Sequence, residues 1–168
     1  MTDFRISFSK TGPLVFISHL DLTHTFVRTF KRAGIPLRYS SGFNPHPKIV
    51  FALPLSVGTA GENELCDIGL ARDMDKEDFT DKLRAALPPH IEIKSVSEST
   101  GKFNNVYSAD YIFSAEGVCG ICENIREFLS KDDITVEKKT KSEEKQINIK
   151  PQIFSYEVSE TDGKTNIC

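Results

Sequence analysis

The chain has 168 residues, of which 39% are hydrophobic and 27% charged, so it can bury a core and is not expected to be disordered. No stretch approaches the roughly 18 apolar residues of a membrane-spanning helix, and the N-terminus lacks the apolar run of a signal peptide. Its four scattered cysteines do not form a disulfide scaffold. These features predict a protein of the reducing cytoplasm that does not enter a membrane.

The net charge of −3 is the sum of two parts of opposite sign. Residues 1–56 contain seven Lys or Arg and two acids, which gives a charge of +5. The remaining residues contain 14 bases and 22 acids, which gives −8. The chain is therefore not a uniformly basic nucleic-acid binder, but its N-terminal third can present a local basic face.

In chain order, the first predicted element is a strand at residues 4–8, where Phe and Ile alternate with polar residues. A turn at residues 10–13 follows. Residues 18–33 are predicted to form a helix with one apolar stripe, because apolar side chains recur every fourth position. Ser18 is its expected N-cap, and Gly34 ends it.

The next segments are a loop rich in glycine and proline, two strands, a helix and a further strand. Their predicted bounds are 39–48 for the loop, 49–55 and 64–70 for the two strands, 76–87 for the helix and 91–96 for the last strand. The resulting order β-α-β-β-α-β predicts an α+β fold over residues 1–97, the ferredoxin-like split βαβ sandwich. Such a fold has a four-stranded antiparallel sheet with both helices on one face. Residues 97–108 have the composition of a linker.

Residues 109–168 repeat this order of elements without the last helix and strand. The predicted elements are a strand at 111–113, a helix at 118–130, a strand at 134–136, a charged hairpin at 137–145, and strands at 147–149 and 153–158. The sequence thus predicts two ferredoxin-like domains in tandem. The second is incomplete at Cys168, where a new strand begins, as in a truncated chain or a half-domain that a partner completes.

Polar, basic and aromatic residues gather in the helix at 18–33 and the loop that follows it. The candidate substrate-binding residues are His19, Asp21, Arg28, Arg32, Arg38, Phe43, Asn44, His46 and Lys48. Such residues can bind an anion such as RNA phosphate, while Phe43 or Tyr39 stacks on a base. Alternatively, the loop residues hold the loop together through bonds to its backbone, and the helix charges are simply solvated.

Two further groups of residues are candidate sites. A metal held by His19, His24 and His46 is disfavoured, because residues five apart on a helix are separated by about 500° and do not share a face. Cys119 and Cys122 form a C-x-x-C at a predicted helix start, which is either a redox pair or two semi-buried packing residues. No metal site is predicted.

Three strings of the sequence carry a resemblance to a known family. They are residues 10–22 (KTGPLVFISHLDL), 32–36 (RAGIP) and 41–55 (SGFNPHPKIVFALPL). They resemble the radical-SAM-linked family DUF2344, most closely over residues 5–58 and more weakly to the end of the chain. The resemblance implies a partner and a context: members are fused to, or encoded beside, a B12-binding-type radical SAM protein, near genes for an RNA-processing ribonuclease and ribosomal proteins. It implies no reaction.

The expected function is that of a non-catalytic accessory module, which binds a substrate such as tRNA or rRNA and presents it to the radical SAM partner. The chain has no three closely spaced cysteines, so the iron–sulfur cluster and S-adenosylmethionine are expected on the partner. Two alternatives remain open at this point. One is an enzyme that uses His19, His46 and Lys48 as acid–base groups, and the other is a protein–protein adaptor.

Overall fold

The computed structural model describes residues 3–116, 120–139, 144–162 and 164–168. The chain divides into two compact units, Met1–Val106 and Tyr107–Cys168. Each unit combines helix with antiparallel strands, as expected of an α+β protein. Among the helices in the described ranges, none has the length and apolar character needed to cross a membrane.

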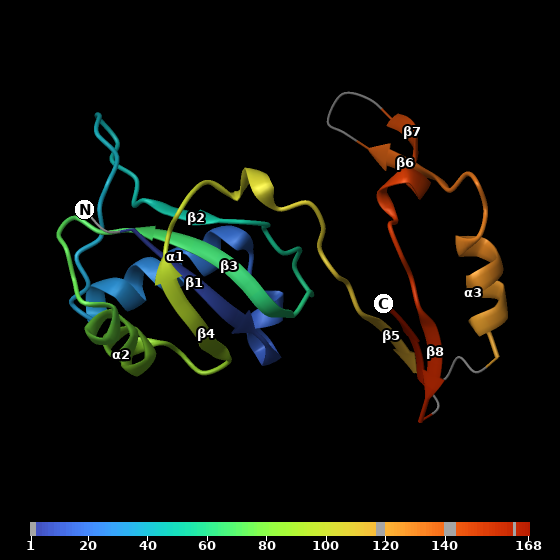
Figure 1. The fold of residues 1–168 in the computed structure, drawn as a ribbon, viewed down its shortest axis with the longest axis horizontal. Helices are drawn as coiled ribbons and strands as arrows, with labels where there is room; N and C mark the ends of the chain where they lie inside the picture. The colour runs from blue at the N-terminus through green and yellow to red at the C-terminus, as the bar shows by residue number, and fades with distance from the viewer. Residues whose placement is uncertain (1–2, 117–119, 140–143, 163) are drawn as a thin grey trace. The chain divides into compact units, whose positions relative to one another are not determined.

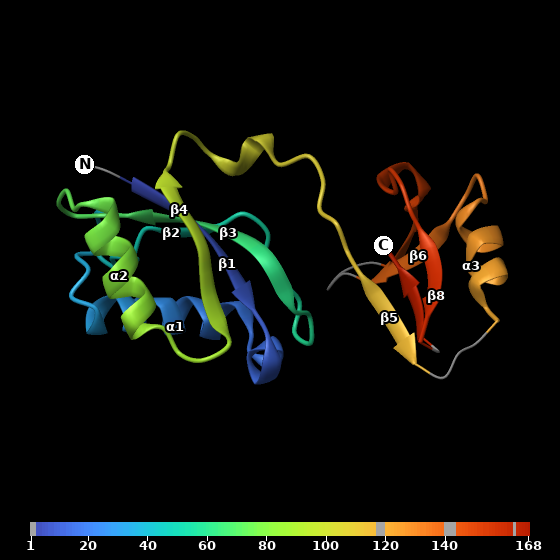
Figure 2. The same ribbon diagram turned by 60° about the horizontal axis from the view of Figure 1, so that its bottom comes forward.

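The first unit is built on a four-stranded sheet in the order β2-β3-β1-β4, in which all neighbours are antiparallel. Its elements are β1 (Asp3–Lys10), the 3-10 helix η1 (Gly12–Phe16), α1 (His19–Arg32), β2 (Ile49–Phe51), β3 (Gly61–Gly69), α2 (Lys76–Ala86), β4 (Ile91–Glu98) and the 3-10 helix η2 (Phe103–Asn105). Both long helices lie on the same face of the sheet (Figure 2). The other face is polar and carries the charged side chains described below.

Phenylalanine rings join the sheet to the two helices. The rings of Phe8 on β1 and Phe26 on α1 have centroids 5.1 Å apart, and Phe4 on β1 lies 4.7 Å from Phe79 on α2. Phe30 of α1 stacks on Phe79 at 6.3 Å, which closes the core between the helices. Each fully buried side chain of this size stabilises the fold by about 1.5–3 kcal/mol relative to an exposed one.

The predicted limits of the first helix are confirmed to within one residue. The hydroxyl of Ser18 accepts a hydrogen bond from the backbone N–H of Asp21 at 3.1 Å and donates one to its carboxylate at 2.7 Å. At the other end, Gly34 has φ +67, a left-handed conformation that costs glycine little. The helix α2 starts in a similar way, because Asp75 accepts from the N–H groups of Glu77 and Asp78.

Two predictions about the ends of strands in the first unit are wrong. The strand predicted at 49–55 ends at Phe51, shortly before Pro54, which cannot donate a ladder hydrogen bond. Lys10 was placed in a turn but is the last residue of β1 and only 1% exposed. The pKa of its ammonium group is lowered, because the effect of burial outweighs the opposing effect of the nearby Glu64 carboxylate.

The second unit contains two small antiparallel sheets. Its elements are β5 (Phe113–Glu116), α3 (Cys122–Leu129), β6 (Thr135–Lys139), β7 (Glu144–Asn148), the 3-10 helix η3 (Lys150–Gln152), β8 (Val158–Thr161) and β9 (Lys164–Ile167). One sheet has the order β5-β9-β8, and the other is the β6-β7 hairpin.

The structure corrects several details of the second unit. The strand predicted at 153–158 is present only from Val158 onward, as β8. The first strand begins at Phe113 rather than ending there. The helix predicted at 118–130 begins only at Cys122, because Gly120 at φ +79 is outside helical geometry. The last strand, β9, was expected to be the start of an unfinished element, but it is the central strand of its sheet and pairs on both sides.

Candidate nucleic-acid interface

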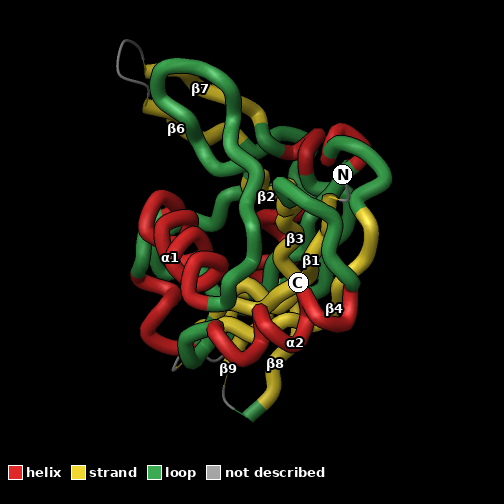
Figure 3. Tube along the Cα trace, turned by 90° about the vertical axis from the view of Figure 1, so that its left-hand side faces the viewer, coloured by secondary structure: helices red, strands yellow, loops and turns green. Residues whose placement is uncertain are grey.

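The loop between α1 and β2 forms a narrow arm, which we define as residues 39–47. It contains no helix or extended strand (Figure 3, green), and it reaches beyond the end of the four-stranded sheet (Figure 1). Its two sides are held together by hydrogen bonds. The N–H of Ser40 donates to the carbonyl of His46 at 2.8 Å, and the N–H of His46 donates to the hydroxyl of Ser40 at 3.0 Å. At the tip, the ring of Phe43 is fully exposed, and Asn44 is exposed beside it.

The base of the arm is anchored to the sheet by an ion cluster. The carboxylate of Asp3 on β1 accepts a hydrogen bond from the Lys48 ammonium at 2.9 Å and another from the Arg38 guanidinium. Both side chains cross Gly69 of β3, where an added Cβ would lie 2.7 Å from Lys48 and 3.0 Å from Arg38. Gly69 is therefore required for the two cations to reach Asp3. Burial opposes ionisation of Asp3, but Lys48 and Arg38 outweigh it and lower its pKa.

A second charged cluster on the polar face is organised by Arg5. Its guanidinium makes two hydrogen bonds to the carboxylate of Asp67, at 2.7 and 2.9 Å, and a third to the carbonyl of Gly101 at 2.7 Å. The guanidinium carbon also lies 4.2 Å from the centroid of the Phe103 ring. The Asp67 hydrogen bond raises the pKa of Arg5 against the effect of burial. Residues 99–106, expected as part of a linker, are thus held on the sheet.

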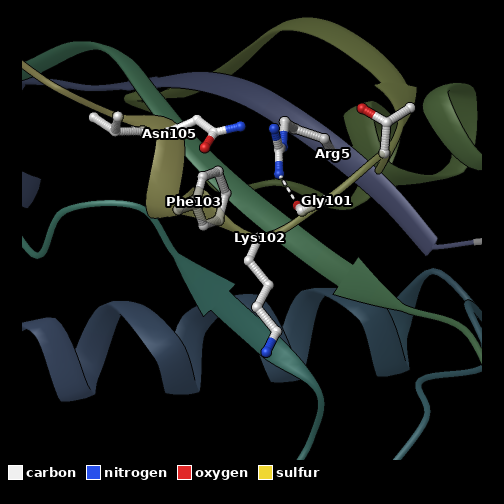
Figure 4. A pocket seen from close by; sticks show the side chains of 7 residues that line it. Arg5, Gly101, Lys102, Phe103 and Asn105 are labelled. Carbon is white, nitrogen blue, oxygen red and sulfur yellow. Dashed lines mark hydrogen bonds between the residues drawn. The ribbon is translucent and has the colours of Figure 1, made fainter.

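Figure 4 shows the cavity beside this cluster. It has a volume of about 170 Å³ and is lined by Arg5 and by residues 100–103, 105 and 106. The Arg5 guanidinium is already bonded to Asp67 and Gly101, and the side chain of Lys102 points away from it (Figure 4). The cavity therefore presents no converging acid–base pair.

The candidate residues of α1 have separate roles. The ring of His19 packs edge-on against Phe51 at 5.0 Å. Asp21 belongs to the N-terminal cap of the helix. Arg32 donates to the carbonyl of Ala86 at the end of α2 and so helps to join the two helices. Arg28 is exposed on the outer surface of the helix, where it is available to a ligand.

The contacts described do not bring together the three residues of the enzyme alternative. The His19 ring lies against Phe51, whereas the Lys48 ammonium is bonded to Asp3. Residues 48 and 51 are three strand positions apart, which corresponds to about 10 Å. His46 is on the arm, where its carbonyl accepts from the N–H of Ser40. A general acid and base would need to lie within hydrogen-bonding reach of one substrate.

No three metal-ligating side chains gather in the described ranges. Cys66 is in the core of the first unit, where burial raises the pKa of its thiol, and Cys168 is exposed at the end of the second. Cys122, the first residue of α3, is buried, and its sulfur lies 4.0 Å from the hydroxyl of Thr165. Cys119, the other half of the C-x-x-C, is outside the described residues.

Three residues that organise this surface were missed by the sequence analysis: Asp3, Arg5 and Gly69. Asp3 and Arg5 are on the polar side of a strand that was recognised only by its apolar side, and Gly69 was assigned to a strand without a role. The one available signal was the alternation itself, which places Asp3 and Arg5 on the same face. It could not identify their partners.

A comparison with protein families identifies the family of the chain. The family model described as an uncharacterized protein conserved in bacteria (DUF2344) matches residues 4–168. The chain belongs to this family. The DUF2344 match extends over both units, so it covers the arm, the polar face of the first sheet and the second unit alike. No curated protein matches the chain.

Proposed function

We propose that this DUF2344 protein is an accessory module that binds RNA through the arm and α1 and presents it to a radical SAM partner. The observation that carries the RNA half of the proposal is the position of Phe43. Its ring is fully exposed at the tip of a hydrogen-bonded arm, where it packs against no other part of the chain described. An aromatic ring held in this way is a platform on which an unpaired base can stack.

The charge near the arm supports the same ligand. Arg28 and Lys31 are exposed on α1, and Lys48 is half-exposed at the base of the arm. Lys48 and Arg38 both bond to the carboxylate of Asp3, and the Lys48 side chain remains 51% exposed. These cations can neutralise RNA phosphates, while Phe43 supplies the stacking contact. Arg38 and Arg32 contribute mainly by holding the arm and helix in place.

The partner half of the proposal rests on the family resemblance described above. In that context the iron–sulfur cluster and S-adenosylmethionine belong to the partner polypeptide, and the substrate is tRNA or rRNA. The cytoplasm is the compartment in which such a complex would act. For the scaffold, we propose the ferredoxin-like split βαβ arrangement of the first unit, which is supported by its sheet order β2-β3-β1-β4.

The RNA half is tested by fluorescence anisotropy with labelled tRNA and with an unstructured RNA, each titrated at several salt concentrations. We expect affinity to fall as salt rises, because phosphate contacts release counterions. Replacing Phe43 with Ala should weaken binding about fivefold or more, since one base–aromatic stack contributes about 1–3 kcal/mol. Arg28→Ala should reduce the slope of log affinity against log salt by about 0.7.

The matched control is Phe154→Ala, which removes a ring of the second unit that is 77% exposed. It should leave RNA affinity unchanged. The RNA half is wrong if neither RNA binds, if affinity does not depend on salt, or if Phe43→Ala and Phe154→Ala have equal effects. Co-purification of a radical SAM protein after nuclease treatment tests the partner half separately.

A further inference from the structure

An apolar surface borders the outer edge of β2, where η1, the start of α1 and the chain after β2 come together. Two contacts join these segments: the His19 ring lies 5.0 Å from Phe51, and the N–H of Gly58 donates to the carbonyl of Val15 at 2.7 Å. Four exposed apolar side chains come from the same segments, and we call them the β2-edge surface: Phe16, Leu20, Leu53 and Val57. No RNA-binding role was assigned to any of them.

The strand at this edge offers backbone groups for pairing. In the antiparallel ladder with β3, the carbonyl of Lys48 accepts from Gly69 at 2.8 Å and the N–H of Ala52 donates to Leu65 at 2.9 Å. Because ladder bonds alternate along a strand, the backbone of Phe51 and the carbonyl of Ile49 point outward. In the described part of the sheet, no strand lies beyond β2. An apolar edge of this kind is a template for an added strand.

The charge around the edge indicates which kind of strand would fit. His24 and Lys31 are four and eleven positions after Leu20, so they lie on the same side of α1 as that residue. Lys48 immediately precedes β2 and is half-exposed. The single acid of α1, Asp21, is bonded to Ser18. A second copy paired through the same edge would bring these cations face to face, whereas an acidic segment would be attracted.

We propose that the open edge of β2 binds an extended segment of a partner protein, in which apolar and acidic residues alternate, by adding a strand to the sheet. The backbone of this segment pairs with Ile49 and Phe51. Its apolar side chains pack on the β2-edge surface, and its carboxylates meet Lys31 and Lys48. This site lies outside the stacking contact at Phe43, but it shares Lys31 and Lys48 with the RNA proposal, so the two proposals are distinguished at Phe43 and at the apolar side chains.

The experiment uses the whole chain and a fluorescein-labelled synthetic peptide of alternating valine and glutamate. Two comparison peptides separate the parts of the proposal. One has the same sequence with N-methyl groups on alternate amides, which removes its ladder donors, and the other has lysine in place of glutamate. We expect the acidic peptide to bind in a saturable manner, and we expect neither comparison peptide to bind.

A pair of double variants locates the site. Phe16→Gln with Leu20→Gln removes two apolar side chains that are 72% and 63% exposed, so folding should be unaffected. The matched control, Tyr107→Gln with Ile112→Gln, removes an aromatic and an aliphatic side chain that are 86% and 67% exposed in the other unit. We expect the first variant to bind the acidic peptide at least about tenfold more weakly and the control to be unchanged.

Several results would overturn the proposal. One is equal binding of the acidic peptide and its N-methylated form to the unmodified protein. This comparison does not depend on whether any variant folds. Others are equal affinities of the two double variants, or no binding of the acidic peptide.

Two outcomes would assign the edge to another occupant. Self-association in sedimentation that disappears in Phe16→Gln/Leu20→Gln would show that a second copy covers the edge. Loss of RNA binding in that variant, without any peptide binding, would assign the surface to RNA. Phe43→Ala should keep peptide binding, which separates the two proposals.

Discussion

The two units differ in how much apolar surface they bury, although both are built from helices and antiparallel strands. In the first unit, fifteen buried apolar residues form one cluster. In the described part of the second unit, the buried apolar residues are Cys122, Ile134 and Val158. Its exposed large apolar residues are Tyr107, Tyr111, Ile112, Phe113, Phe128, Val136, Phe154 and Tyr156.

The difference shows that a similar order of elements does not by itself produce a core. In the first unit, four strands share one sheet and two helices cover one face of it. In the second, β6 and β7 form a separate hairpin, and α3 packs mainly against β8, so β5 stays uncovered. Small units also bury a smaller fraction of their surface. We therefore expect the stability of the chain to reside in the first unit.

The largest expected effect comes from the core of the first unit. Phe26 is fully buried and contacts the rings of Phe8, Phe30 and Phe51. Phe26→Ala should lower the free energy of unfolding by about 3–5 kcal/mol, because it removes buried surface and leaves a cavity. The corresponding change in the second unit, Phe113→Ala, should cost less than about 0.5 kcal/mol. Urea unfolding followed by circular dichroism compares them, and equal losses would contradict the contrast.

An intermediate effect is expected at the cluster that holds residues 99–106 on the first sheet. Arg5→Met removes the paired hydrogen bonds to Asp67 and the bond to Gly101, which should cost about 1–3 kcal/mol. Amide hydrogen exchange in residues 99–106 should become faster, while exchange in the core strands changes little. The control is Lys94→Met, which breaks an exposed pair with Glu92 and should cost at most about 1 kcal/mol. Unchanged exchange in residues 99–106 would mean that Arg5 does not anchor them.

The smallest expected effect is a pH dependence confined to the first unit. Burial raises the pKa of Asp3, but the hydrogen bonds and charges of Lys48 and Arg38 outweigh it, so the pKa falls below its ordinary value of 3.8. A depressed carboxyl pKa contributes stability above the ordinary pKa, and this contribution is lost as pH falls through the folded value.

The urea midpoint measured between pH 2 and 6 checks this expectation. In Asp3→Asn, the part of the acid destabilisation that comes from this group should be absent, and the base of the arm should exchange its amides faster. Asp81→Asn, at an exposed position of α2, is the control. If the pH profiles of Asp3→Asn and the unmodified protein coincide, the ion cluster contributes nothing to stability.

Much of the fold follows from local patterns. The cap at Ser18 and the glycine at position 34 set the limits of α1, and the alternation in residues 4–8 identified β1. These predictions succeeded because capping, helix period and strand period depend on residues a few positions apart. The strand at 49–55 was predicted too long for the opposite reason, since its length depends on where β3 stops pairing with it.

The candidate site divides in the same way. The sequence by itself determined that cations and aromatic rings gather in residues 19–48 and that Phe43 is in a loop. That the ring of Phe43 is exposed was decided by the tertiary structure. Only the tertiary structure decided which cations form ion pairs within the protein. Arg38 and Lys48 meet Asp3 across 35 and 45 residues of chain, and Arg5 meets Asp67 across 62. Such pairs depend on sheet register and on a glycine that lets side chains pass, and neither is visible in residue spacing.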